Sequence, residues 1–292
     1  MSKYKLGIIG GSGLYDLKKF TNAKYIDVTT AWGKPSDQII SFKHKGKEIF
    51  FLPRHGKKHN IQPSFINYRA NIDALKQLGI TDIISFSAVG SLNDAIKPGM
   101  FVVPDQFIDR TYKRANTFFD SDIVCHVSMS KPISESLMET CINALKEIGL
   151  DFIDKGTYIA IEGPQFSTHS ESKGYKLCGA DIIGMTNMPE AKLAREAEIR
   201  YATIGMVTDH DCYKAEYLDV DINQIISTLK TNIELAKKVI NILITTFDKN
   251  IKKNDPIQNC LNSAIITDIS TARKETLSNL NIVMRRYKHE NK

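Results

Sequence analysis

Two acidic residues follow an apolar stretch of the chain and could handle a proton. Residues 201–207 are largely apolar, and Thr208-Asp209-His210-Asp211 comes next. A carboxyl group that faces into a closed pocket has a raised pKa, so it can share a proton with a nitrogen of a heterocyclic base. A pair of aspartates at this position can also cap a loop, and the residues alone leave both interpretations open.

Two other segments carry groups that suit an anion. Pro53-Arg54-His55-Gly56 places a guanidinium and an imidazole after an apolar stretch. Arginine grips phosphate oxygens through paired N–H donors, and a neighbouring histidine can add another donor. Gly10-Gly11-Ser12-Gly13 could turn backbone N–H groups and a hydroxyl toward an anion, or could form only a tight turn. A dinucleotide-binding fingerprint fails here, because Asp16 replaces its third glycine.

The spacing of histidines and cysteines does not favour a metal site. His55 and His59 have the i, i+4 spacing seen in metal sites, but no acidic third ligand accompanies them. The five cysteines are scattered and form no C-x-x-C pair. We therefore expect reduced thiols and no metal ion.

Apolar stretches and helical periodicities alternate along the chain. Strands are expected at residues 5–9, 38–42, 48–52, 82–87, 100–104, 157–161, 181–185 and 201–207, and helices at 63–78, between Ser134 and Gly149, and at 170–178, 189–197 and 221–247. This alternation predicts an α/β fold, a single domain with a central mixed β-sheet flanked by helices over residues 1–247. Residues 248–292 are expected to form a peripheral C-terminal helical extension of the same domain.

The polar clusters lie where such a fold binds ligands. In α/β sheets the ligand sits at the carboxyl ends of the strands. Polar residues follow strands at residues 10–13, 54–55, 87–91, 162–166, 185–186 and 208–211. The agreement of these separate segments predicts one binding site built from all of them. Within it, the ring of Phe166 could lie against a flat ligand or belong to the core.

Charge and hydropathy disfavour nucleic-acid and membrane proteins. The 292-residue chain has a net charge of +6, and residues 230–292 hold nine Lys and three Arg against six acidic residues. Because acids are interspersed and no aromatic pattern accompanies the basic residues, a solvated helical segment is favoured over a nucleic-acid site. The apolar stretches are far shorter than the roughly 20 residues of a membrane span. The first residues do not resemble a signal peptide, so we expect a cytoplasmic protein.

Taken together, these segments resemble the trimeric purine nucleoside phosphorylase superfamily, and most closely its methylthioadenosine branch. The resemblance runs from about residue 5 to residue 246 and keeps the motifs in order. The matching stretches are GIIGGSGL at 7–14, RHG at 54–56, NYRAN at 67–71, SAVGSL at 87–92, DQFIDRT at 105–111, IEGPQF at 161–166, MT at 185–186 before PE at 189–190, and TDHDC at 208–212.

The resemblance implies roles for individual residues. Phosphate would be bound by Ser12, Arg54, His55, Ser87, Ala88 and Thr186. The nucleoside would contact Phe166, Ile183 and Met185, and its 5'-methylthio group would face Ile222, Ile225 and Ile226. Asp209 and Asp211 would be catalytic residues at the N7 and 6-amino edge of the purine, and His126 would reach the neighbouring subunit's site. Asn187 and His210 depart from the family's commoner threonine and tyrosine, which affects fine specificity.

The implied reaction is the phosphorolysis of methylthioadenosine to adenine and 5-methylthioribose 1-phosphate, a step of purine and methionine salvage. Inorganic phosphate would be a co-substrate, no cofactor would be needed, and the protein would be a homotrimer or a dimer of trimers. The nearest alternative is a phosphorylase for 6-oxopurine nucleosides such as inosine, guanosine or methylthioinosine. It would share every motif except the residues at the purine edge. A dinucleotide-binding module and a nucleic-acid-binding tail are further alternatives, which the glycine and charge patterns disfavour.

Overall fold

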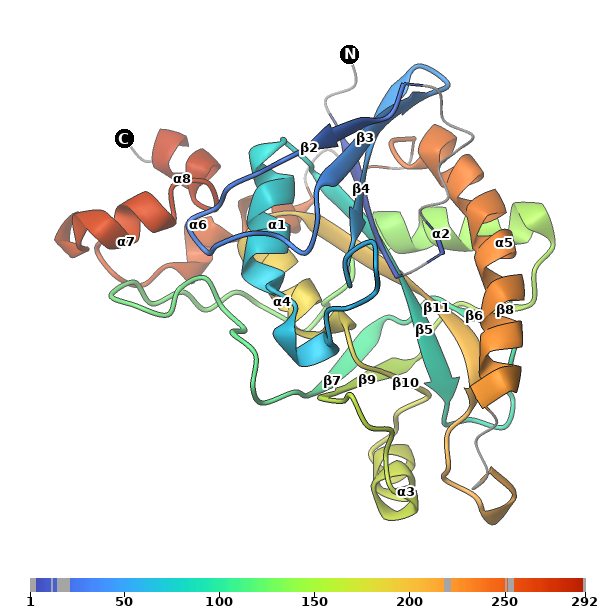
Figure 1. The fold of residues 1–292 in the computed structure, drawn as a ribbon. Helices are drawn as coiled ribbons and strands as arrows, with labels where there is room; N and C mark the ends of the chain where they lie inside the picture. Colours follow the sequence, from blue (N-terminus) through green and yellow to red (C-terminus); the bar gives the residue numbers. More distant parts are fainter. Residues whose placement is uncertain are drawn as a thin grey trace.

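The computed structural model describes residues 4–11, 13–14, 22–217, 222–249, 251 and 255–290. Its centre is a mixed β-sheet with helices on both faces (Figure 1), so the predicted single-domain α/β fold is confirmed. The described strands are β1 Leu6–Gly10, β2 Lys24–Ile26, β3 Ile39–His44, β4 Lys47–Pro53, β5 Asp82–Ser91, β6 Phe101–Val102, β7 Gln106–Arg110, β8 Phe152–Ile153, β9 Thr157–Ile161, β10 Ile182–Gly184 and β11 Arg200–His210. The described α-helices are α1 Tyr68–Gln77, α2 Glu135–Ile148, α3 His169–Leu177, α4 Asn187–Glu196, α5 Ile222–Thr246, α6 Leu261–Ala264, α7 Lys274–Asn279 and α8 Arg285–Glu290.

The central strands are buried because helices cover both faces of the sheet. The strand order is β2-β3-β4-β1-β5-β10-β9-β7, and β11 pairs with β5 and continues to β6 and β8. β11 runs parallel to β5 over most of its length, and both read as largely apolar runs, as expected of strands covered on two faces. α2 packs against α5 beside β11, whereas α1 packs against α4.

The strand β10 explains why polar residues from distant segments meet. It pairs with the carboxyl end of β5 in the antiparallel direction, with Ile182 opposite Ser91 and Ile183 opposite Gly90. The residues that follow β10 are thereby brought back along the last part of β5. The hydroxyl oxygens of Ser87 and Thr186 consequently lie 3.2 Å apart.

One expected helix begins later than predicted, and one strand of the structure was not expected, both for local reasons. The helix predicted from residue 63 begins only at Tyr68, because the Asn67 side chain accepts a hydrogen bond from the Ala70 N–H and caps α1 there. Pro63–Phe65 forms a separate 3-10 turn, and Phe65 is 78% exposed rather than part of the buried helix face. The strand β7 was not expected, since Gln106, Asp109 and Arg110 hide the apolar pattern of this edge strand.

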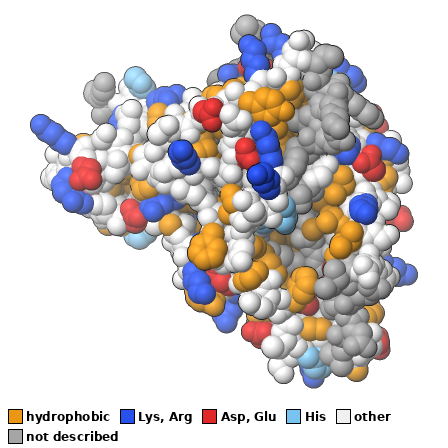
Figure 2. All heavy atoms as spheres, viewed as in Figure 1, with side chains coloured by type: hydrophobic (Ala, Val, Ile, Leu, Met, Phe, Trp, Pro, Cys, Tyr) orange, Lys and Arg blue, Asp and Glu red, His pale blue; other side chains and the backbone are white. Residues whose placement is uncertain are grey.

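The described C-terminal residues form short helices on one side of the sheet, beyond α1 and α4 (Figure 1). Leu280, Val283 and Met284 are buried in the same apolar cluster as the central strands. In Figure 2, basic and acidic side chains alternate over the face that these helices present, as expected of a solvated segment. Among the described residues, the helices are all too short or too polar to pass through a lipid bilayer.

Candidate active site

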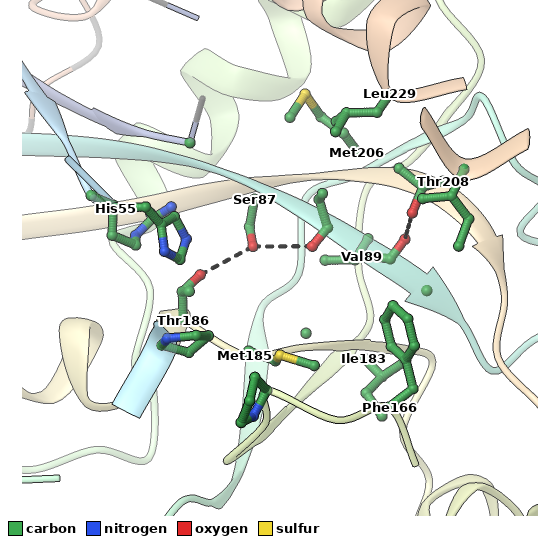
Figure 3. A pocket seen from close by; sticks show the side chains of 18 of the residues that line it. His55, Ser87, Val89, Phe166, Ile183, Met185, Thr186, Met206, Thr208 and Leu229 are labelled. Atoms are coloured by element: carbon green, nitrogen blue, oxygen red, sulfur yellow. Dashed lines mark hydrogen bonds between the residues drawn. The ribbon is translucent and has the colours of Figure 1, made fainter. Parts of the chain in front are cut away.

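A cavity of about 630 Å³ opens where the carboxyl ends of the central strands meet β10 (Figure 3). It is lined by residues from all six predicted polar segments. The predicted site residues that line it are Arg54, His55, Ser87, Ala88, Phe166, Ile183, Met185, Thr186, Asp209, Asp211 and Ile225. Ser12 lies outside the described residues, although its neighbour Gly11 lines the cavity. The structure therefore brings together most of the side chains that the sequence nominated.

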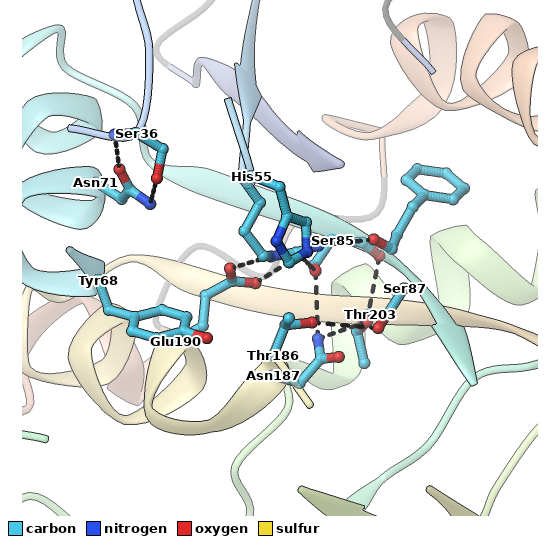
Figure 4. Close-up of polar contacts among 12 residues, drawn as sticks. Ser36, His55, Tyr68, Asn71, Ser85, Ser87, Thr186, Asn187, Glu190 and Thr203 are labelled. Atoms are coloured by element: carbon cyan, nitrogen blue, oxygen red, sulfur yellow. Dashed lines mark hydrogen bonds and ion pairs between the residues drawn. The ribbon is translucent and has the colours of Figure 1, made fainter. Parts of the chain in front are cut away.

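One end of the cavity is lined by hydroxyl groups. The Ser87 Oγ lies 3.2 Å from the Thr186 Oγ1 (Figures 3 and 4). It also lies 3.4 Å from the Tyr158 hydroxyl. Both Ser87 and Thr186 are buried, and each hydroxyl can donate a hydrogen bond to an anion. Tyr158 was not nominated from the sequence, because a tyrosine inside an apolar strand reads as core.

Arg54 forms a buried ion pair with the carboxylate of Glu190. Its Nε donates to Glu190 Oε2 at 2.8 Å and its Nη2 to Glu190 Oε1 at 3.1 Å, with side chains 2% and 1% exposed. The Nη2 also donates to the Ser85 Oγ and the Nη1 to the Phe86 carbonyl. Burial disfavours the charged guanidinium, but Glu190 outweighs it and raises the pKa of Arg54.

This ion pair changes the expected role of Arg54. An arginine has five N–H donors, and the contacts with Glu190, Ser85 and Phe86 use four of them. Among the described contacts, one Nη1 hydrogen is left for a ligand in the cavity. Arg54 therefore offers a single donor instead of the bidentate grip expected from the sequence. The paired N–H groups bind Glu190 instead. Glu190 lies 136 residues from Arg54, so the sequence around Arg54 does not indicate this ion pair.

His55 presents an acceptor to the cavity. Burial and the adjacent charge of Arg54 lower the pKa of His55 to about 4, so the imidazole is neutral at pH 7. Its Nδ1 lies 2.8 Å from the Ile61 carbonyl oxygen, which can only accept. The single ring proton is therefore on Nδ1, and Nε2 carries a lone pair. The extra donor expected from the sequence is thus an acceptor in the free protein.

Asp209 is placed by a bulge in β11. The pairing with β5 shifts register between Val207 and Asp209, so Thr208 is an extra residue at the site, where such bulges re-aim side chains. The Thr208 hydroxyl donates to Asp209 Oδ1 at 2.6 Å. Burial raises the pKa of Asp209, with a further contribution from Asp211 that opposes the effect of Thr208. Burial therefore favours the protonated form of Asp209 more than it would for an exposed aspartate.

Asp211 is held in a different way. Its Oδ1 accepts from the Cys212 N–H at 2.9 Å, and its Oδ2 accepts from the Ser172 hydroxyl at 2.6 Å. Both oxygens are thus fixed by donors, whereas those of Asp209 are bound at one oxygen only among the described residues. The two carboxyl groups therefore have unequal hydrogen-bonding environments.

Two glycines leave room for the walls of the cavity. A Cβ at Gly90 would lie 3.1 Å from Ile183 and 3.5 Å from Asp209 Oδ2, so a side chain here would crowd the carboxyl. Gly163 has φ +66, and a Cβ there would collide with the Met185 sulfur. Phe166, three residues later, is 61% exposed at the opening of the cavity (Figure 3). The apolar wall therefore fits around two glycines, one near the end of β5 and one in the loop after β9.

The three isoleucines of α5 do not act together. Ile225 lines the cavity with Leu229 one helical turn later, whereas Ile226 does not line it and is 45% exposed. Residues i and i+4 share a helix face, so Ile225 and Leu229 face the cavity together. The adjacent residue Ile226 lies on a different face of the helix. The side chain of Ile222 lies outside the described part of the helix.

His126 lies away from the cavity of its own chain. It is exposed, and its N–H donates to the Ala264 carbonyl at 2.8 Å, next to the C-terminal helices. Within the described ranges, no group of three or more His, Cys, Asp or Glu residues could hold a metal ion. The cavity thus offers hydroxyls, an imidazole lone pair, one guanidinium donor and two unequal carboxyls.

Comparisons with known proteins agree with this chemistry. Residues 5–245 match the family profile described as the phosphorylase superfamily. The chain is 44% identical over 283 residues to an S-methyl-5'-thioadenosine phosphorylase of Geobacter sulfurreducens, covering 97% of this chain and 98% of that protein. A methylthioadenosine phosphorylase from an antarctic soil metagenomic library superposes with a TM-score of 0.88 at 42% identity, over 96% of this chain and 98% of that one. A methylthioadenosine phosphorylase from Schistosoma mansoni in complex with adenine gives 0.84 at 34%, over 90% and 99%.

Proposed function

The chain belongs to the phosphorylase superfamily, and from this membership we propose that it cleaves S-methyl-5'-thioadenosine with inorganic phosphate to adenine and 5-methylthioribose 1-phosphate. It is thus a pentosyltransferase. The choice of substrate is supported by the unequal pair of carboxyls at the end of β11. Among the described residues, Asp209 accepts a hydrogen bond at one oxygen and Asp211 at both.

Phosphate is the nucleophile in this proposal. The hydroxyls of Ser87 and Thr186 and the remaining N–H of Arg54 donate to its oxygens. The Nε2 lone pair of His55 accepts a hydrogen bond from a protonated phosphate oxygen. Held under the sugar, the phosphate stabilises the positive charge that develops as the glycosidic bond lengthens, and then attacks the anomeric carbon. Such positioning supplies a large part of the rate enhancement in reactions of this kind.

Asp209 supplies the proton in this proposal. Electrons of the breaking C1'–N9 bond flow into the purine, and the Asp209 carboxyl transfers its proton to N7, so that adenine leaves as a neutral base. Burial raises the pKa of the Asp209 carboxyl and so favours its protonated form. General-acid help of this kind is typically worth about 10²–10⁴-fold in rate.

The same pair explains a preference for adenine over 6-oxopurines. Adenine presents an acceptor at N7 beside a 6-amino donor, whereas hypoxanthine presents acceptors at both positions. A protonated Asp209 donates to N7 and, through its other oxygen, accepts from the amino group, and the fixed carboxylate of Asp211 adds a second acceptor nearby. Phosphorolysis of inosine or methylthioinosine is therefore not favoured.

The finer points of the proposal concern the whole protein. We infer a homotrimer or dimer of trimers, in which the exposed His126 reaches the neighbouring subunit's cavity. We propose that the reaction needs no metal or organic cofactor. We also propose that the enzyme is cytoplasmic and serves purine and methionine salvage. Residues 248–292 are proposed to be an extension of the single catalytic domain formed by residues 1–247.

The test is the release of free base from a panel of nucleosides. Methylthioadenosine, adenosine, methylthioinosine and inosine are each incubated with the protein, with and without phosphate. Adenine released from methylthioadenosine only when phosphate is present supports the proposal. Equal release without phosphate identifies a hydrolase, and faster cleavage of methylthioinosine identifies the 6-oxopurine specificity.

A further inference from the structure

A second buried ion pair lies behind the nucleoside end of the cavity. Arg114 belongs to the irregular connection between β7 and α2, yet its side chain is only 1% exposed, and that of its partner Glu162 is 6% exposed. The Arg114 Nε donates to Glu162 Oε1 at 3.1 Å. Arg114 lines no part of the cavity itself, so its role is not to touch a substrate.

The guanidinium of Arg114 binds main-chain oxygens of the two loops that form the apolar wall. Its Nη2 donates to the carbonyls of Ile161 at 3.3 Å and Glu162 at 2.8 Å, at the end of β9. Its Nη1 donates to the carbonyls of Met185 at 2.5 Å and Met188 at 2.7 Å, after β10. Ile161 and Met185 line the cavity, and so does Phe166 beyond Glu162.

A third segment is attached at the same point. The Tyr68 hydroxyl lies 3.0 Å from the Arg114 Nη1, so the two hydrogens of Nη1 are shared among three acceptors, and this hydroxyl donates to the Pro63 carbonyl at 3.1 Å. The Ser64 hydroxyl donates to Glu162. Pro63 is part of the cavity wall. One planar cation therefore joins three wall segments that are far apart in the sequence.

Glu162 fixes the arginine in turn. Its Oε2 accepts from the backbone N–H groups of Tyr112 at 2.7 Å and Lys113 at 3.1 Å, which fixes the chain directly before Arg114. Burial acts to raise the pKa of Glu162, but these hydrogen bonds, Ser64 and Arg114 lower it to about 2. Glu162 is therefore a carboxylate at neutral pH.

We propose that Arg114 is a positioning residue for the base-binding half of the site, because its hydrogen bonds set the spacing between the Ile161–Phe166 loop and the Met185 loop. The inference rests on the proposed function. The phosphate half is held by the separate Arg54–Glu190 pair (Figure 4). Thr186 follows Met185, so loss of Arg114 reaches one phosphate contact, whereas Arg54 is held by Glu190, Ser85 and Phe86. Loss of Arg114 is therefore expected to affect binding of the base more than binding of phosphate.

The test compares Arg114→Lys with a matched control. Lysine keeps the charge but offers donors from one nitrogen, so it cannot reach both pairs of carbonyls. Arg69→Lys makes the same change in an arginine that binds Asp120 on the same connection and does not line the cavity. Adenine affinity is measured by calorimetry, and the phosphate KM is measured at saturating methylthioadenosine, below the melting temperature of each variant.

Arg114→Lys is expected to weaken adenine binding by about 10–100-fold and to change the phosphate KM by less than about 3-fold. The reason is that the substitution displaces the wall around the base but removes no side chain that binds the phosphate. Arg69→Lys should match the wild type in both. If Arg114→Lys does not fold, Glu162→Gln is expected to show the same split. Wild-type adenine affinity, or equal losses for adenine and phosphate, would overturn the inference. A wild type that neither binds adenine nor releases it from methylthioadenosine would instead defeat the proposed function.

Discussion

The Ser172 hydroxyl donates to Asp211 Oδ2 at 2.6 Å and ties α3 to the end of β11. Ser172 is fully buried, although α3 is otherwise a polar helix. A capping box formed by Thr168 and Glu171 fixes the first turn of α3, and so places Ser172 opposite Asp211. A residue of a surface helix thus orients a carboxylate of the proposed purine site.

Ser172→Ala should loosen Asp211 without touching the phosphate end of the cavity. A hydrogen bond to a charged group contributes about 1.5–3 kcal/mol, so we expect kcat/KM for methylthioadenosine to fall by about 10-fold or more. The phosphate KM should stay near the wild-type value. Ser170→Ala, an exposed serine of the same helix, serves as the control. Unchanged kcat/KM in Ser172→Ala would mean that Asp211 does not act on the substrate.

Substitutions in the buried pair Arg54–Glu190 should change the stability of the fold and the phosphate KM independently. Arg54→Met alone leaves Glu190 as an unpaired buried charge, which costs about 3–5 kcal/mol of unfolding free energy. Adding Glu190→Gln removes that charge and should restore most of the stability. The phosphate KM should remain raised by about 10-fold or more in the double variant, because the donor to the nucleophile is still missing.

Urea unfolding and phosphate kinetics on the three proteins check this prediction. A double variant with wild-type phosphate KM would show that Arg54 has only a structural role. A single variant as stable as the wild type would show that Glu190 is not buried as a charge.

Ile225 and Ile226 form a matched pair for the 5' group. Ile225 lines the cavity, whereas Ile226 is partly exposed outside it. Ile225→Ala should lower the preference for methylthioadenosine over adenosine by about 10-fold, since an apolar pocket discriminates modestly per methylene. Ile226→Ala should leave the ratio of the two kcat/KM values unchanged. The opposite order of effects would place the 5'-methylthio group elsewhere.

His55 should make the fold sensitive to acid. Its pKa is about 4 in the folded protein, against 6.5 for an unperturbed histidine. Between these values the unfolded chain binds a proton that the folded protein does not. The stabilising contribution is therefore complete above pH 6.5 and is lost as the pH falls toward 4. His55→Gln cannot titrate, so between pH 7 and about 4.5 it should lose less stability than the wild type, by on the order of 1–3 kcal/mol. Parallel losses in urea unfolding at the two pH values would contradict this.

The residues that the sequence identified are those with a local signal. Asp209, Arg54 and Thr186 follow apolar strands directly, and the fold rule for α/β sheets brings strand ends together. Ser172, Glu190 and Arg114 carry no such signal, because their functions depend on partners 39, 136 and 48 residues away. The single remaining donor of Arg54 and the lone pair of His55 follow from those distant contacts, so composition and spacing could not predict them.

In the proposed mechanism one protonated carboxyl, Asp209, hydrogen-bonds both N7 and the 6-amino group of adenine, and replacement of that carboxyl tests its role. An asparagine at this position could donate its NH₂ to both N7 and O6, and would match the 6-oxopurine pattern. Sites that hydrogen-bond a polar group can reject mismatched analogues by up to about 10⁴–10⁵-fold. The measurement is kcat/KM for methylthioadenosine and methylthioinosine in the wild type and in Asp209→Asn. We predict that the wild type prefers methylthioadenosine and that Asp209→Asn shifts the ratio toward methylthioinosine. A wild type that prefers methylthioinosine, or a variant that keeps the wild-type ratio, would contradict the role assigned to Asp209.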